Sequence, residues 1–148
     1  MAIKLSTGLR NHLAVTGSVR NAIQGMVLVI YAGTEPSTAD SAIPGDGVAL
    51  ATISTGGTGA GLNFETVAVQ GVLTKAAADT WQGTNAANGT ATYYRLQTGA
   101  DDGSLSDVLL RVQGKVGTIN ADLFLSSVAL VQSAVQRIGS YTLTVPAQ

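Results

Sequence analysis

The feature that most constrains the fold is a repeated alternation between short β-branched or apolar runs and clusters of Gly, Asn, Ser and Thr. The uninterrupted run 26–31 predicts a central strand. Residues 33–47 hold two of the three prolines and predict a long surface loop. Further strands are expected at 48–54, 62–64, 67–69, 71–74, 80–82, 90–98, 108–116, 123–125 and 141–145. The strand at 108–116 is expected to be the longest, and 126–135 fits a helix or a strand, of which we favour extended structure.

Many short strands joined by turn residues, with no helices between them, predict an all-β domain over residues 26–148. We expect a β-sandwich with jelly-roll topology. Residues 1–25 differ, because Leu5, Leu9 and Leu13 recur at helical spacing after Ser6, a suitable N-cap. A second short turn can start at Ser18, and Gly25 suits a left-handed end. The sequence therefore predicts an N-terminal helical arm that packs on the sandwich or on a neighbouring chain.

The composition favours association with other proteins. Charged residues make up 11% of the chain, against about 25% in typical soluble domains. A neutral polar surface loses less solvation energy than a charged one when a partner covers it. A Thr- and Gly-rich surface without a large interface explains the same composition, so both interpretations remain open. With 45% apolar but only 5% aromatic residues, the core should be aliphatic.

Several classes of function are disfavoured. The net charge is −1 and the eight basic residues are scattered from Lys4 to Arg137, so we expect no direct binding to nucleic acid. The chain has no Cys, which removes disulfides, thiolate zinc sites and cysteine nucleophiles. We expect neither a signal peptide nor a membrane span, because polar residues interrupt every apolar run.

No arrangement of residues predicts catalysis. His12 is the single histidine, and no carboxylate lies near it in the sequence. Asp101, Asp102 and Asp107 share one loop, where calcium is conceivable, but their spacing differs from a known calcium loop. The glycines of residues 56–61 are followed by no Lys-Ser or Lys-Thr, so we expect a flexible loop and no phosphate site. We predict a non-enzymatic protein with no catalytic, cofactor-binding or metal site; a hydrolase on a β-scaffold is the weakest alternative.

The candidate interface consists of the stripe Leu5, Leu9 and Leu13, with His12 beside it, and of Trp81. So short a helix needs a packing partner, either its own sandwich or a neighbour. Trp81 is the only tryptophan; a lone Trp either fills the core or anchors an interface, and the core is favoured.

Four segments resemble small structural proteins of tailed bacteriophages: residues 4–11 (KLSTGLRN), 29–40 (VIYAGTEPSTAD), 80–83 (TWQG) and 140–147 (SYTLTVPA). The similarity extends over most of the chain and is greatest to capsid decoration, or cement, proteins. The resemblance implies a homotrimer on the exterior of the virion capsid that bridges and stabilises major capsid proteins. A tail-associated structural module, or a receptor- or carbohydrate-binding β-sandwich, is the alternative that it leaves open.

Overall fold

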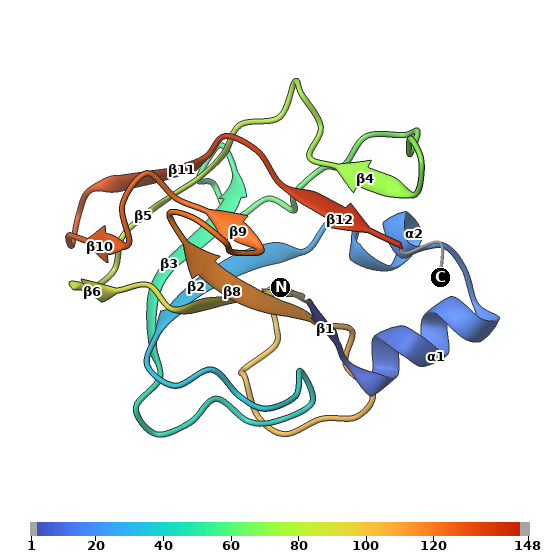
Figure 1. Cartoon of the computed structure of the whole chain (residues 1–148), viewed down its shortest axis with the longest axis horizontal. Coiled ribbons are helices and arrows are strands. Elements are labelled where there is room, and N and C mark those ends of the chain that lie inside the picture. The colour runs from blue at the N-terminus through green and yellow to red at the C-terminus, as the bar shows by residue number, and fades with distance from the viewer. Residues whose placement is uncertain (1–2, 146–148) are drawn as a thin grey trace.

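The computed structural model describes residues 3–145 and shows a mostly β protein with two short helices at its N-terminal end (Figure 1). This confirms the predicted all-β class and the short N-terminal helical segment. The ends of the two predicted segments, residues 1–2 and 146–148, lie outside the described residues. The strands are β1 (Lys4–Leu5), β2 (Val27–Ala32), β3 (Val48–Thr55), β4 (Val72–Thr74), β5 (Trp81–Thr84), β6 (Gly89–Thr90), β7 (Tyr93–Gln97), β8 (Val112–Gly117), β9 (Leu123–Phe124), β10 (Ala129–Leu130), β11 (Val135–Ile138) and β12 (Thr142–Thr144).

The two helices begin at the predicted caps. Helix α1 (Thr7–Val15) follows Ser6, whose side chain accepts a hydrogen bond from the Leu9 amide at 3.1 Å. Helix α2 (Val19–Ile23) follows Ser18, which caps it in the same way. Gly25 then has a φ of 85°, the left-handed conformation that glycine adopts without strain. Ser6 and Ser18 therefore set where the two helices begin, and Gly25 marks the end of the helical segment.

A single bent sheet dominates the fold, with the strand order β1-β8-β7-β2-β3-β5-β11 and with β9 pairing parallel to β8. Its other pairings are antiparallel. Two small sheets, β10–β6 and β12–β4, complete a sandwich-like arrangement. A bulge between Ile30 and Tyr31 interrupts the β2–β3 register, and bulges bend a strand. The structure does not confirm the predicted jelly-roll topology.

The main core joins the arm to the sheet. Leu9, Ala22 and Ile23 from the helices belong to the same buried cluster as Leu28 and Ile30 of β2. The arm therefore packs on the sheet of its own chain. Aromatic side chains also meet in this core: Phe64, Trp81, Tyr94 and Tyr141 lie with ring centroids 5.2–6.2 Å apart. The prediction of an aliphatic core is thus incomplete, because most of the few aromatic residues are gathered in one place.

Both faces of β2 are buried, as its uninterrupted apolar run predicts. On the face away from the main core, Val27, Val29 and Tyr31 form a second cluster with Tyr93 of β7. The Tyr31 and Tyr93 rings are stacked, 5.0 Å apart and 10° from parallel. Ile43, from the predicted loop 33–47, packs against this cluster. The loop therefore covers the sheet instead of extending into solvent.

Several predicted strands differ in the structure. Strand β8 starts only at Val112, and the longest strand is β3, with eight residues. Residues 108–111 leave the strand pattern because the Ser106 hydroxyl accepts hydrogen bonds from the next amides, a local turn that competes with sheet pairing. The segments 62–64 and 67–69 form only isolated bridges. Segment 126–135 is not helical and contains β10, as favoured, followed by a turn that leads into β11.

Candidate functional site

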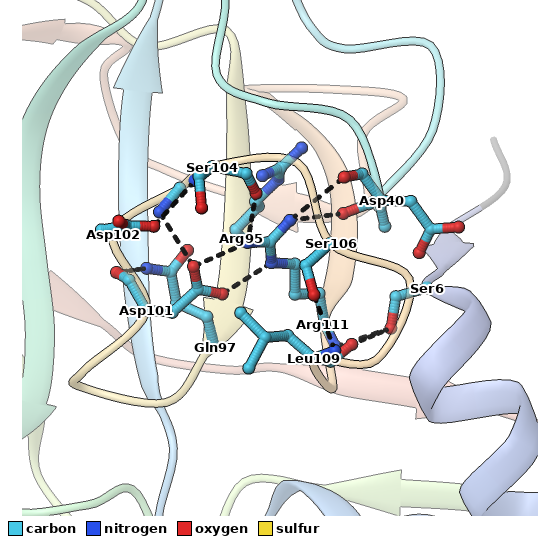
Figure 2. Close-up of polar contacts among 12 residues, drawn as sticks. Ser6, Asp40, Arg95, Gln97, Asp101, Asp102, Ser104, Ser106, Leu109 and Arg111 are labelled. Atoms are coloured by element: carbon cyan, nitrogen blue, oxygen red, sulfur yellow. Dashed lines mark hydrogen bonds and ion pairs between the residues drawn. The ribbon is translucent and has the colours of Figure 1, made fainter.

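Two features of the described chain bring together side chains of similar polarity. One is a buried polar cluster, defined as Arg95, Gln97, Asp101, Arg111 and Gln113. It lies on the face of β7 and β8 that the loops 33–47 and 98–111 cover (Figure 2). The other is an apolar groove beside the helices.

The centre of the polar cluster is a bidentate ion pair. Arg111 donates from Nε to Oδ2 of Asp101 at 2.6 Å and from Nη2 to Oδ1 at 2.7 Å. The exposed fractions of the two side chains are 0% and 1%. Arg111 also donates to the carbonyl oxygens of Ala39 and Ser104, one in each covering loop. The pair therefore joins both loops to the sheet and is closed to solvent.

The second buried guanidinium has no carboxylate partner. Arg95 donates to Gln113 Oε1 at 2.9 Å and to the Ser41 carbonyl oxygen at 2.6 Å, while its Nη1 has no hydrogen-bond partner within residues 3–145. Burial, followed by the charge of Arg111, lowers the pKa of Arg95. Burial disfavours the charged form of Tyr93 as well, which in a tyrosine raises the pKa, here to about 12.

The cluster also anchors the start of α1. The Ser6 hydroxyl donates to the Leu109 carbonyl oxygen at 2.7 Å and accepts from the Arg111 amide at 2.9 Å (Figure 2). Asp40 accepts from the amide and the hydroxyl of Thr7 at 2.8 and 2.6 Å. The polar cluster therefore fixes two long loops and one helix end. Such contacts provide rigidity, whereas a catalytic site needs polar groups that a substrate can reach.

The apolar groove lies between the N-terminal arm and β12 and has a volume of about 320 Å³. We call it the helical-end groove, because Figure 1 places α1, α2 and β12 at the same end of the molecule. Every side chain that lines it is uncharged: Ile3, Leu5, Leu9, Leu13, Gly17, Ser18, Val19, Leu143, Thr144 and Val145. A second groove of about 320 Å³ adjoins it and shares Ser18, Val19 and Val145.

Exposed valines surround the same end of the molecule. Val15, at the last position of α1, is 88% exposed, and Val67, Val69 and Val145 are each more than half exposed. Single exposed apolar residues are common on protein surfaces. Beside two apolar grooves, however, they extend one apolar surface, which is the pattern of protein-binding sites.

The structure separates the predicted interface residues. Leu5, Leu9 and Leu13 all line the helical-end groove, with Leu9 fully buried at its base. His12 is half-buried, and its Nε2 lies 3.2 Å from Oδ1 of Asn21 in α2. Trp81 is a correction: it is 1% exposed, and its Nε1 donates to Asp79 Oδ2 at 3.0 Å inside the core. In this fold Trp81 is a core residue and cannot contact a partner.

The other chemical candidates also have local roles. Asp101 binds Arg111, and Asp102 accepts from the amide of Ser104, two residues on, as in a turn. Within residues 3–145, no group of three or more His, Asp or Glu side chains is placed to hold a metal ion. The glycines of residues 56–61 form a turn after β3, and the chain that follows enters the core at Leu62. The structure therefore does not bring the loop carboxylates together as ligands.

Sequence reasoning missed the polar cluster. The sequence pattern that corresponds to this cluster is two arginines and two glutamines at alternate positions. Arg95 and Gln97 lie in β7, Arg111 lies just before β8, and Gln113 lies within β8. Alternation of this kind normally indicates a face in contact with water.

The comparisons with known proteins identify no relative. No family model matches the sequence, and neither a curated protein nor a solved structure matches it. In the described part of the chain, neither helix has the length and apolar character needed to cross a membrane. Fold and geometry together define an all-β protein with a buried polar cluster on one face of its sheet and the uncharged helical-end groove at one end.

Proposed function

We propose that this protein is a non-enzymatic structural module that binds another protein chain through the helical-end groove. The observation that carries the proposal is the groove itself, a concave surface of about 320 Å³ without a single charged lining residue. Removing apolar surface from water stabilises a complex by roughly 25 cal/mol per Å². Because no charge has to be desolvated, little of that gain is lost when a partner covers the groove.

The setting that we propose is the exterior of a tailed-phage capsid, where a homotrimer bridges major capsid proteins. Three features support it: the resemblance of four sequence segments to small phage structural proteins, the 11% content of charged residues, and the apolar surface at the helical end. A protein that binds the assembled shell but not its free subunits stabilises the shell by mass action. A threefold ring is one of the closed symmetries that homo-oligomers adopt.

The buried polar cluster supports a role without catalysis. Its ion pair is enclosed, and both guanidinium groups also donate to carbonyl oxygens of the covering loops. The cluster instead gives the module a fixed shape, and rigid surfaces lose less entropy on binding than mobile ones.

The test is to add the purified protein to undecorated shells of the phage that encodes it. We expect it to sediment with the shells, to raise their resistance to heat, and to run as a trimer in analytical ultracentrifugation. Leu13→Asp places a charge in the groove and should weaken binding at least tenfold. Val131→Asp, at an exposed position that lines neither groove, is the control and should bind like the wild type.

Each part of the proposal has its own contrary result. Failure to bind shells, or binding without a gain in heat resistance, contradicts the capsid role. Binding to tails at low copy number, or a hit on a glycan array, supports the tail-associated or receptor-binding alternative. Equal loss in the Leu13 and Val131 variants excludes the groove as the contact surface.

A further inference from the structure

One wall of the helical-end groove is a strand with an unpaired edge. Beside the β4–β12 pair, the Val145 amide donates to the carbonyl oxygen of Gly71. The Lys75 amide donates to the carbonyl oxygen of Tyr141. The register places each of these two pairs directly opposite one another. Bonded and non-bonded pairs alternate in an antiparallel ladder. Leu143 is therefore bonded to β4, whereas Thr142 and Thr144 point their N–H and C=O groups away from it.

Those outward groups belong to the strand that borders the groove. Thr144 lines the groove, and β12 pairs with no strand other than β4 among the described residues. Leu143, between the two threonines, has its side chain in the core. A chain that lay along this edge would therefore place every second side chain on the same side as Leu143, which lines the groove together with Leu5 and Leu13.

We propose that the helical-end groove accepts one extended, uncharged segment of a partner protein, which adds to β12 as a third strand of the β4–β12 sheet. The inference rests on the proposed function and names the chemistry of its partner. Main-chain hydrogen bonds to Thr142 and Thr144 hold the segment, and Val, Ile or Leu at alternate positions fill the groove. The paired portion is short, because β4 and β12 have three residues each.

The absence of charged residues in the groove favours an uncharged partner segment over a charged one. A Lys, Arg, Asp or Glu at a groove-facing position of the partner would be desolvated among side chains that offer no counter-charge. The edge strand β11 at one end of the main sheet differs: Arg137 lies on it, and charged residues discourage strand addition at edges. The partner segment should therefore be neutral and should bind at β12.

The experiment is a selection of short peptides from a random display library on the immobilised full chain. We expect enriched peptides with uncharged apolar residues at every second position. Each peptide is then synthesised in two N-methylated forms, one for each set of alternate amides. Methylation of the set that faces β12 should weaken binding at least tenfold, while methylation of the other set should leave it nearly unchanged, because only one edge of an added strand pairs with β12.

Variants of the protein supply the matched controls. Thr144→Pro removes an outward N–H without removing a bond to β4, so the fold should persist while peptide binding is lost. Val135→Pro makes the same change on the free edge of β11, where Asn85 bonds to Ala134 and leaves the Val135 amide pointing outward. That variant should bind peptide like the wild type. Circular dichroism verifies that both variants fold.

The outcomes distinguish this inference from the proposed function. Failure to enrich any peptide, equal effects of the two methylation patterns, or full binding by Thr144→Pro overturns strand addition. If shells still bind in any of these cases, the proposed function stands with a different contact. If peptides bind as expected but shells do not, strand addition stands and the capsid role fails. Enrichment of the chain's own sequence would identify a second copy as the occupant and overturn the choice of a different partner protein.

Discussion

Replacing Asp101 by Asn should destabilise the fold strongly, because Arg111 then keeps its buried charge without a carboxylate. The side chain keeps its size, so no cavity forms. Both oxygens of Asp101 accept from the guanidinium, at 2.6 and 2.7 Å. However the Asn amide is turned, its NH2 group faces a guanidinium N–H, and one of the two hydrogen bonds is replaced by a repulsive contact.

The expected loss follows from burial. Removing one partner of a buried ion pair costs about 3–5 kcal/mol. One hydrogen bond to the Asn oxygen persists, so the lower value, about 3 kcal/mol, is the better estimate. With a urea m-value of about 2 kcal/mol per M for a domain of this size, the midpoint of unfolding should fall by about 1.5 M. The positive charge of the nearby buried Arg95 repels that of Arg111, which destabilises the variant further.

Urea unfolding followed by circular dichroism measures the effect. The neighbouring Asp102→Asn variant is the matched control and should leave the midpoint nearly unchanged, because this carboxylate is exposed and caps only a turn. The double variant Asp101→Leu with Arg111→Met should recover much of the loss, since apolar residues often replace a buried pair without cost. A midpoint of Asp101→Asn equal to that of the wild type would refute the idea that this pair holds the loops.

Three further predictions follow from other contacts. Gly8→Ala should lower the melting temperature in calorimetry, although Ala in a helix is normally about 1 kcal/mol better than Gly, because the new Cβ would lie 2.3 Å from the Val108 carbonyl oxygen. Tyr141→Phe leaves the buried Tyr94 hydroxyl without its partner at 3.0 Å and should reduce the urea-derived stability by about 1–3 kcal/mol; an unchanged midpoint would contradict the contact. Burial alone would raise the pKa of Asp40, but hydrogen bonds from the first residue of α1 outweigh it and lower the pKa. The stabilisation by Asp40 is therefore complete above the ordinary Asp pKa of about 3.9 and disappears as the pH falls through the lower folded value, so the stability difference between the wild type and Asp40→Asn should narrow with acidification.

Local signals were the ones that sequence reasoning interpreted correctly. Ser6 and Ser18 cap their helices, Gly25 takes the left-handed conformation, and β2 is buried on both faces. In each case the physical cause lies within a few residues: a side-chain oxygen near orphan amides, a missing Cβ, or an unbroken apolar run.

Contacts between distant segments could not be predicted in this way. Arg95 and Gln97 alternate with apolar residues as they would on a strand with one face in water. Arg95 is buried because loop 33–47, more than fifty residues earlier, supplies carbonyl oxygens such as that of Ser41, and Gln97 bonds to the carbonyl oxygen of Asp101 in loop 98–111. For Trp81 the sequence favoured the core, but not its neighbours there, and the structure shows Phe64 and Tyr141 packed around it. The stripe of Leu5, Leu9 and Leu13 was visible, but its opposite wall in β12 was not.

The polar cluster and the helical-end groove are physically linked through the start of α1. The Ser6 hydroxyl accepts from the Arg111 amide on one side and from the Leu9 amide on the other, while Leu9 forms the base of the groove. Any movement of α1 that widened the groove would have to break these bonds or those of Asp40 to Thr7. The groove is therefore held open in one shape before a partner arrives, and a preformed site avoids most of the ordering cost of binding. Under the proposed function, buried polar residues on one side of α1 therefore help to preform the binding surface on its other side.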